Sequence, residues 1–348
     1  MTRQTWTAFV SAVFFVGLAV LLAVLPVPFV SWNPGSARDT LGTAGSEPII
    51  KVEGIDTYPT SGQLDMTVVS VTPADGRLSL PEALLAYWLP HRDTLPRDSV
   101  YLPGKSAEEV ASEDADMMET AQDDAVVAAL RADGQPVTEM PAIYSVTVGG
   151  AAHQKLMPGD LVVSVDGVPT PTTTSVSEQI RARKVGQEVA FVVIRQKAEA
   201  RVEITTSEST TQPDVAVVGI TLGAGYRYQP VISFDFGRRI GGPSAGLVFA
   251  LAIYDKITDG ALLAGRHVAG TGTIGPDGQV GPIGGLQEKI GGAEKAGATV
   301  FLVPAGNCAD LAGLKTDMTL IKVETLAGGI AALQALSGPA PTADLPRC

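Results

Sequence analysis

The chain has 348 residues, of which 45% are hydrophobic, and its formal net charge is −12. This length accommodates two or three domains with substantial apolar cores. The acidic balance is typical of a soluble, self-repelling surface and argues against a nucleic-acid partner, because phosphate binding needs clustered Lys and Arg. The sequence has no HExxH or CxxC motif, so a zinc hydrolase has little support, and we expect neither a metal nor a cofactor.

The first segment is long and apolar enough to cross a membrane as a helix. Residues Gln4–Ala37 carry no charge, and Ala8–Leu25 is almost wholly apolar. The alternative is a cleaved signal peptide, but its apolar region is normally shorter, and the small residues Gly35–Ala37 lie far beyond the run. Arg3 precedes the run and favours a cytoplasmic N-terminus. The sequence therefore predicts a single-pass anchor in the lipid bilayer of the cell membrane, with the remaining chain extracytoplasmic.

Three further segments follow before the middle of the chain. Ser31–Ser46 is rich in Gly, Pro and Ser and indicates a linker. Leu64–Val71 predicts a strand, and Pro81–Trp88 predicts a short helix that starts at a proline. Ala107–Leu130 has a helical pattern with eight acids and no base between residues 108 and 124. Such a charge run is usually a solvated helix face, and a partner-docking surface is the alternative.

The middle of the chain changes to a β pattern. Ile143–Val148 and Leu161–Val165 predict strands, separated by small residues and by the turn Pro158-Gly159-Asp160. This order, closed by an Asp-Gly turn after the second strand, resembles the core of bacterial PDZ domains. The resemblance implies a sheet edge that accepts an extended peptide beside an apolar pocket. Any small β-barrel with a Gly-Asp turn is the alternative.

A serine near the start of a buried helix is the first candidate for chemistry. Ser244 lies between small residues and just before Leu247–Tyr254, which is apolar all round. Small neighbours let a substrate backbone approach, and free amides at a helix N-terminus can stabilise an oxyanion. A serine that only caps the helix is equally compatible with this fragment. None of the three histidines has a compelling context as the base, so we consider a lysine instead.

Lys289 is the lysine best placed for this role. In a helix over residues 286–297, it lies on the edge of the inner face that Leu286 and Ile290 define, whereas Gln287, Glu288 and Lys295 point away. Burial would lower the pKa of Lys289 and leave a neutral amine able to take a hydroxyl proton. Periodicity alone favours a lysine whose amine reaches solvent from the helix edge.

The resemblance of two motifs to a known family favours a buried, catalytic Lys289 over a lysine that reaches solvent. Gly242–Gly246 (GPSAG) and Gly281–Lys289 (GPIGGLQEK) resemble, in order and separation, the proteolytic domain of Lon-type proteases. In that family the serine and the lysine form a catalytic dyad, and a Thr-Gly motif precedes the lysine. The resemblance implies that Ser244 is the nucleophile, that Lys289 is the base, and that Thr271 supports the lysine amine by a hydrogen bond. It also implies a homo-oligomeric ring.

The sequence departs from Lon-type proteases in having no recognisable ATPase module. The only GKS, at Gly104–Ser106, lacks the earlier glycine of a P-loop, so we expect no nucleotide. The order of anchor, PDZ-like and Lon-like domains resembles ATP-independent, membrane-anchored bacterial proteases. This implies a serine endopeptidase that cleaves unfolded or flexible extracytoplasmic polypeptides. The alternatives are a membrane-tethered PDZ scaffold with a non-catalytic Lon-like assembly domain, and a C-terminal-processing protease, against which the two motifs argue.

The expected fold class is α+β, in six consecutive segments. They are a cytoplasmic tip and transmembrane helix (1–30), a linker (31–48), a β-rich membrane-proximal region with the acidic helix (49–135), a PDZ-like β domain (136–206), a Lon-type α/β proteolytic domain (214–338) and a C-terminal tail (339–348). The two cysteines, Cys308 and Cys348, lie in a disulfide-permissive compartment if the orientation is right. A bridge that ties the tail to the last domain and two free thiols are both compatible with the sequence.

Overall fold

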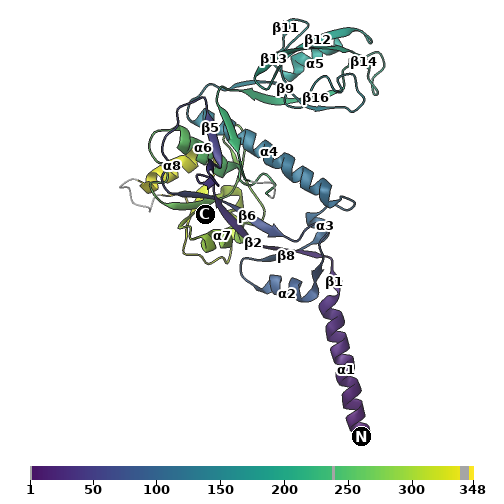
Figure 1. The fold of residues 1–348 in the computed structure, drawn as a ribbon, viewed down its shortest axis with the longest axis vertical. Coiled ribbons are helices and arrows are strands. Elements are labelled where there is room, and N and C mark those ends of the chain that lie inside the picture. The colour runs from purple at the N-terminus through teal and green to yellow at the C-terminus, as the bar shows by residue number, and fades with distance from the viewer. Residues whose placement is uncertain (1, 237–239, 338–344) are drawn as a thin grey trace. The chain divides into compact units, whose positions relative to one another are not determined.

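The chain forms two compact units, the second inserted into the sequence of the first. The computed structural model describes residues 2–236, 240–337 and 345–348. Unit 1 comprises Met1–Gln135 and Pro230–Cys348, and unit 2 comprises Pro136–Gln229 (Figure 1). The expectations for residues 237–239, just before the serine turn, and for most of the tail at residues 338–344 lie outside the described residues.

Unit 1 contains both helices and strands. Its helices are α1 (Arg3–Val24), α2 (Leu80–Trp88), α3 (Arg97–Val100), α4 (Ala107–Ala132), α6 (Gly246–Ile257), α7 (Leu286–Ala296), α8 (Leu326–Ser337) and the 3₁₀ helix η1 (Ala305–Leu311). Its strands are β1 (Pro26–Val27), β2 (Phe29–Asp39), β3 (Thr43–Ala44), β4 (Glu47–Pro48), β5 (Ile50–Glu53), β6 (Gln63–Val71), β7 (Leu78–Ser79), β8 (Asp93–Pro96), β17 (Val231–Phe234), β18 (His267–Gly270), β19 (Thr273–Ile274), β20 (Val280–Gly281), β21 (Val300–Pro304) and β22 (Thr319–Val323).

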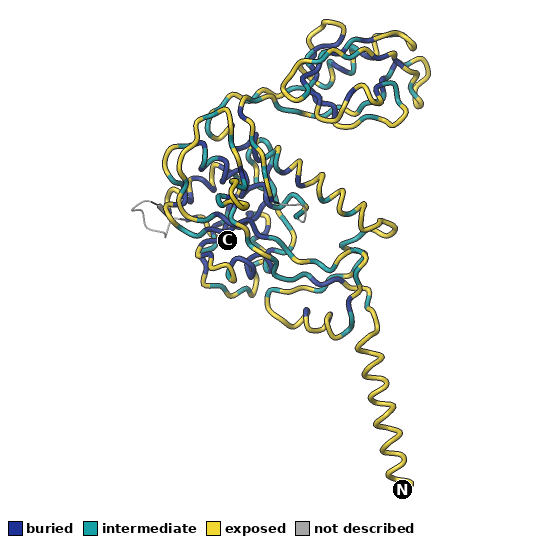
Figure 2. The backbone as a smooth tube through the Cα atoms, viewed as in Figure 1, coloured by how far each residue is buried: buried dark blue, intermediate teal, exposed yellow. Residues whose placement is uncertain are grey.

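Helix α1 has no buried residue along its 22-residue length (Figure 2). Its most apolar 18-residue window has a mean hydropathy of 2.6, so the helix is long and apolar enough to span a membrane. The Thr2 side chain caps its first turn by accepting a hydrogen bond from the Thr5 amide.

The core of unit 1 is a mixed six-stranded sheet with the order β22-β21-β18-β6-β2-β8. Strands β6, β18, β21 and β22 run parallel, while β2 is antiparallel to both of its neighbours. The expected strand at Leu64–Val71 is confirmed as β6. The membrane-proximal region and the segment with the two Lon-like motifs therefore share one sheet.

Strand β2 corrects the expectation of a linker at residues 31–48. Pro34 and Gly35 indicated a loop, but they lie at an irregularity in the pairing of β2 with β6. At this point β2 passes so close to β6 that a Cβ at Gly35 would collide with the carbonyl oxygen of Val68. The glycine therefore serves a close approach between two strands inside the sheet.

Helices α6 and α7 contact the sheet and carry the two motifs. Helix α7 contacts β2 and β6, whereas α6 contacts β6 and also packs against α4 and α8. Leu247–Ile253 is fully buried, as expected of a helix that is apolar all round. The acidic run of α4 is largely exposed, which agrees with a solvated face, and its last turns, Ala125–Leu130, are buried.

Unit 2 is built on a sheet with the order β13-β12-β10-β9-β16. Its elements are β9 (Thr138–Val146), β10 (Leu161–Val165), β11 (Val168–Pro169), α5 (Thr173–Arg181), β12 (Glu188–Arg195), β13 (Ala198–Thr205), β14 (Ser207–Glu208), β15 (Ala216–Val217) and β16 (Ile220–Arg227). Strand β16 falls within residues 214–338, which the sequence assigned to the proteolytic domain. Instead it pairs with β9 of unit 2 along nearly the whole length of that strand.

The Pro158-Gly159-Asp160 turn of unit 2 is exposed except for its aspartate. The Asp160 side chain is almost fully buried and accepts hydrogen bonds from Arg195 at 2.7 and 2.6 Å and from the Met157 amide at 2.9 Å. A buried carboxylate needs such partners. The aspartate therefore fixes the turn that leads into β10.

The C-terminal residues are tied to unit 1 by a disulfide between Cys308 and Cys348. The Lys322 amide also donates to the carbonyl oxygen of Pro346 at 2.9 Å, and the Leu345 side chain is buried. Of the two states that the sequence left open, the structure has the bridge.

Candidate active site

Ser244 lies in the tight turn that leads into α6, and this turn is tied to the residues that follow β18. The Ser244 carbonyl oxygen accepts hydrogen bonds from the Gly272 amide at 2.8 Å and from the Thr271 hydroxyl at 2.9 Å. Gly246 packs against Ile274, where an added Cβ would lie 2.9 Å from the isoleucine Cγ2. A larger residue at 246 would therefore push the turn, and Ser244 with it, away from β19.

Lys289 projects from the first turn of α7 into the interior of unit 1, and only 3% of its surface is exposed. Its Nζ donates a hydrogen bond to Thr271 Oγ1 at 3.0 Å. Burial lowers the pKa of Lys289 from its ordinary 10.5 to about 7, although the neighbouring Glu288 carboxylate opposes the shift. This is the direction expected for a lysine on the inner edge of the helix. At neutral pH a large share of the molecules therefore holds a neutral amine.

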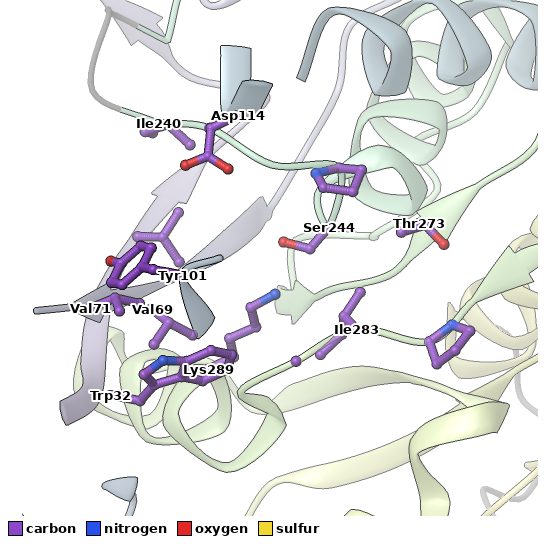
Figure 3. A pocket seen from close by; sticks show the side chains of 15 residues that line it. Trp32, Val69, Val71, Tyr101, Asp114, Ile240, Ser244, Thr273, Ile283 and Lys289 are labelled. Carbon is purple, nitrogen blue, oxygen red and sulfur yellow. The ribbon is translucent and has the colours of Figure 1, made fainter. Parts of the chain in front are cut away.

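The Thr271 hydroxyl joins the serine turn to the lysine amine. Its single proton is donated to the Ser244 carbonyl oxygen, so toward Lys289 it can only accept. A neutral amine thus uses an N–H on Thr271 and keeps its lone pair for another donor. Figure 3 shows the Lys289 amine and the Ser244 hydroxyl projecting into the same pocket. The Ser244 hydroxyl forms no hydrogen bond with any described residue, so its proton is available to a base in this pocket.

Ser244 and Lys289 open onto one pocket with a volume of about 610 Å³ (Figure 3). The lining comes from strands β2 and β6, the residues around α3 and α4, the serine turn and the start of α7. It consists of Trp32, Val68, Val69, Val71, Tyr101, Asp114, Ile240, Gly241, Pro243, Ser244, Thr273, Pro282, Ile283, Gly284 and Lys289. The two Lon-like motifs thus form only part of the pocket, and most of the other lining residues lie between Trp32 and Asp114 in the sequence.

Three side chains of this pocket were missed in the sequence: Trp32, Tyr101 and Asp114. The Trp32 ring lies so close to the start of α7 that a Cβ at Gly284 would be 2.8 Å from the ring Cη2. The double glycine Gly284-Gly285 was therefore the sign that a large group packs there. The Tyr101 hydroxyl donates to the Thr72 carbonyl oxygen at 2.7 Å, and neither Tyr101 nor Asp114 stands in a motif.

Some backbone amides around Ser244 donate hydrogen bonds to described residues, and others do not. The Gly242 amide donates to the Asp114 carbonyl oxygen at 2.8 Å, which fixes the loop against α4. The amides of Ser244 and Ala245 have no acceptor among the described residues. Free amides beside a nucleophile are suited to hold a developing oxyanion.

Glu288 corrects the expectation that it points away from the core. Its side chain is buried, because the segment that leads into β8 covers this side of α7. His91 of that segment lies 3.0 Å from the Gln287 carbonyl oxygen and 3.4 Å from the Glu294 carboxylate. Burial raises the pKa of Glu288, and the nearby Asp93 adds to the rise. Lys295 is exposed, as expected.

Unit 2 has a groove of its own, with a volume of about 500 Å³. It lies between α5 and β16, and its apolar lining includes Ile180, Ile220 and Leu222. Gly149 and Gly150 stand at one end, where the small-residue segment of the PDZ-like pattern is found. Strand β9 pairs with one edge of β16, and none of the strands that the structure describes pairs with its other edge.

Comparison with known proteins agrees with the two resemblances. Residues 239–333 match the family model of the Lon protease (S16) C-terminal proteolytic domain, and this stretch includes Ser244, Thr271 and Lys289. Residues 121–206 match the family model of the PDZ domain. The chain therefore contains a Lon-type proteolytic domain and a PDZ domain, in addition to its N-terminal apolar helix.

The curated relatives include Lon proteases that match about a fifth to a quarter of this chain. A Lon protease of Roseiflexus castenholzii is 46% identical over 70 residues, which cover 20% of this chain and 8% of the relative. A Lon protease of Clostridium beijerinckii is 40% identical over 89 residues, which cover 24% of this chain and 11% of the relative. The chain thus spans about a tenth of the length of these relatives. The matches support a Lon-like serine peptidase.

Among solved structures, the chain is similar to the PDZ domain of an SdrC-like protein from Listeria monocytogenes. The identity is 23%, the coverage is 24% of this chain and 86% of that chain, and the TM-score is 0.22. A protein from Geobacillus thermodenitrificans has the same identity and TM-score, with coverage of 24% of this chain and 95% of that chain.

Proposed function

We propose that the protein is a serine endopeptidase in which Ser244 is the nucleophile and Lys289 the general base. The observation that carries the proposal is the buried Lys289 amine, whose pKa is lowered to about 7, which is held by Thr271 and which shares one pocket with Ser244. A neutral amine in a shielded site can take a hydroxyl proton at physiological pH.

The proposed reaction is acyl transfer in two halves. Lys289 takes the Ser244 proton as the hydroxyl oxygen attacks a peptide carbonyl, and the free amides of Ser244 and Ala245 stabilise the oxyanion. The lysine then gives the proton to the leaving amine. Water, activated by the same amine, cleaves the acyl-enzyme and restores the serine. Thr271 acts as a positioning residue, because its two hydrogen bonds hold the amine against the serine turn.

The substrates we propose are unfolded or flexible extracytoplasmic polypeptides, cleaved without ATP. A pocket of about 610 Å³ admits a few side chains of an extended segment and not a folded domain. In this proposal α1 anchors the chain in the cell membrane, the catalytic part is extracytoplasmic and forms a ring, and the PDZ domain captures or gates peptides in the groove beside β16.

Substitution of the two reacting residues tests the dyad. Ser244→Ala and Lys289→Ala should each abolish cleavage of a flexible polypeptide in nucleotide-free buffer, and circular dichroism should show the fold retained. Lys295→Ala is the matched control, since that lysine is exposed on the same helix. Substantial turnover by either dyad variant would rule out the assignment.

A labelling experiment separates the proposed peptidase from a non-catalytic scaffold, and a substitution tests the role of the PDZ domain. A fluorophosphonate should label the wild-type serine and leave Ser244→Ala unlabelled, whereas a non-catalytic scaffold would not react. Leu222→Arg would fill the groove of unit 2 and should change which peptides are cut while fluorophosphonate labelling persists. Unchanged selectivity would remove the role proposed for the PDZ domain.

A further inference from the structure

Helix α2 turns its large apolar side chains outward and its small ones inward. Leu84, Leu85 and Trp88 share one face by their spacing, and their exposed fractions are 42%, 54% and 73%. The buried positions are Ala83 and Ala86. Tyr87, beside this face, is also 70% exposed. A helix that faces water on one side normally has the opposite arrangement, so this face is suited to an apolar environment.

The position of α2 in the chain places this face beside the end of α1. Strand β1 begins two residues after α1 ends, and it pairs with β7 in the register Pro26↔Ser79 and Val27↔Leu78. Ser79 is also the residue that caps α2. Helices α1 and α2 are in contact, and they lie next to each other in Figure 1. The apolar face therefore lies where α1 would leave a bilayer.

The residues around α2 have the composition of a membrane interface. Trp and Tyr prefer the headgroup level, where an amphipathic ring has one apolar and one wet side. The exposed arginines Arg77 and Arg92 flank the helix and can meet lipid phosphates, and each has an exposed aspartate, Asp75 or Asp93, within two residues. The one acid in the helix, Glu82, is held at its first turn by the amide and hydroxyl of Ser79.

We propose that α2 docks on the bilayer that α1 crosses, with Leu84, Leu85 and Trp88 inserted at the boundary between headgroups and acyl chains. The inference rests on the proposed membrane anchor. Because α2 packs on β2 and β8, this docking fixes the sheet, and the pocket that β2 lines, at a set height above the lipid. The enzyme then reaches the flexible segments of polypeptides that lie close to the membrane surface.

Spin labelling of the full chain in liposomes of neutral and anionic phospholipid tests the docking. The Cys308–Cys348 bridge leaves an introduced cysteine as the thiol available for a nitroxide. Labels at positions 84 and 88 should collide more with oxygen, which concentrates in lipid, than with a water-soluble nickel chelate. A label at 14, in the middle of α1, should do the same, and one at the exposed Asp259 should show the reverse.

The labels distinguish each way of failing. If 84 and 88 favour the nickel chelate while 14 favours oxygen, the docking is wrong and the anchor stands. If 14 also favours the nickel chelate, the anchor itself is wrong. If 84 and 88 are shielded from both reagents, another protein copy covers the face, and the docking is again wrong. Leu85→Glu should shift the label at 88 toward the nickel chelate, whereas the control Leu102→Glu, at another exposed leucine, should not.

A separate observation concerns Asp114, whose carboxylate points into the pocket in Figure 3. It makes no ion pair with a cationic side chain among the described residues. Burial raises the pKa of Asp114, and Glu113 adds to the rise, so these surroundings disfavour the charged carboxylate. The pocket lining also includes the apolar side chains of Val71 and Ile240. The pocket thus combines apolar side chains with a carboxylate that no described cationic side chain pairs.

We infer that Asp114 selects substrates that place a lysine or arginine side chain in this pocket. The inference rests on the proposed peptidase function. A long cationic side chain would lay its methylenes along the apolar walls and bring its charge to the carboxylate. The same charge in the substrate would offset the burial and the Glu113 repulsion that disfavour the Asp114 carboxylate.

Matched peptides that carry arginine or norleucine at each position around the cut test the selection. The wild-type enzyme should prefer arginine at one position by at least about tenfold in kcat/KM, a step equivalent to one well-placed ionic contact. Asp114→Asn should remove most of this preference, and the control Asp116→Asn, exposed on the same helix, should keep it. Equal cleavage of both peptides by the wild type, or an unchanged preference in Asp114→Asn, would overturn the inference. Cleavage of neither peptide by the wild type would instead contradict the peptidase function.

Discussion

Protonation of one side chain, Lys289, sets the pH range of the proposed chemistry. With a pKa of about 7, the amine loses its proton as the pH rises through neutrality. Since the base works only when neutral, kcat/KM should fall about tenfold for each pH unit below 7 and level off above it. A pH–rate profile with a flexible peptide measures this limb. A limb centred near 10 would show that the amine is hydrated and that its burial has no catalytic use.

Thr271 should act through the orientation of that amine. Thr271→Val removes the acceptor for Lys289 and the donor to the Ser244 carbonyl oxygen, so kcat should drop by at least tenfold, or about 1.4 kcal/mol. The pH limb should move to lower pH, because a charged ammonium loses more from the missing acceptor than a neutral amine does.

Thr271→Ser is the matched control for this change. It keeps the hydroxyl and should restore most of the rate and the position of the limb. If valine and serine reduce kcat equally with no shift of the limb, Thr271 contributes packing only.

At this scale the sequence led to Ser244, Lys289 and Thr271, because each stands in a short local motif. It did not lead to Trp32 or Asp114, which reach the pocket from strands and helices far away in the chain. The sequence wrongly predicted that Glu288 points away from the core, for a related reason. Helical periodicity describes one helix alone, and the burial of Glu288 depends on the segment around His91 that covers it.

Among the elements, α7 depends on the glycines at its start. Gly285 has a φ of +71°, and an added Cβ would lie 2.6 Å from a Val69 methyl group. Gly285→Ala should therefore lower the free energy of unfolding by roughly 1–3 kcal/mol, measured by urea denaturation. It should also reduce activity, because the shifted helix carries Lys289.

Gly104→Ala is the control for the close contact between Gly285 and Val69. Gly104 has a φ of +89° and nothing within 4 Å of an added Cβ, so alanine there meets only the backbone cost. Equal destabilisation by the two substitutions would show that packing against β2 and β6 does not matter at Gly285.

Helices and strands with a regular repeat of apolar residues were predicted well from the sequence. Strands whose position depends on pairing with a distant strand were not. The apolar α6 and the alternating β6 follow from local pattern. Strand β2 contains Pro34 and Gly35, which are loop residues in most contexts, and only the close approach to β6 explains them. Strand β16 was assigned to the wrong side of a boundary because its partner β9 lies about 80 residues earlier.

For the whole molecule, the Cys308–Cys348 disulfide is a covalent crosslink in addition to the backbone. It closes a loop across a sequence separation of 40, so replacing both cysteines by serine should cost about 2–4 kcal/mol and lower the Tm. A reducing agent should lower the Tm of the wild type and leave that of the variant unchanged. Titration of two free thiols in the unreduced wild type would contradict the bridge.

If α1 is the membrane anchor we propose, the shared sheet also determines where the rest of the chain can be cut away from it. A cut after Ala37, at the small residues that resemble a processing site, would carry away most of β2 together with Trp32. The start of α7 would lose the ring that rests on it, water would reach the Lys289 amine, and the amine would regain its charge. Shedding at this point should therefore abolish the proposed peptidase activity, so we expect that a soluble and active form does not arise by that route.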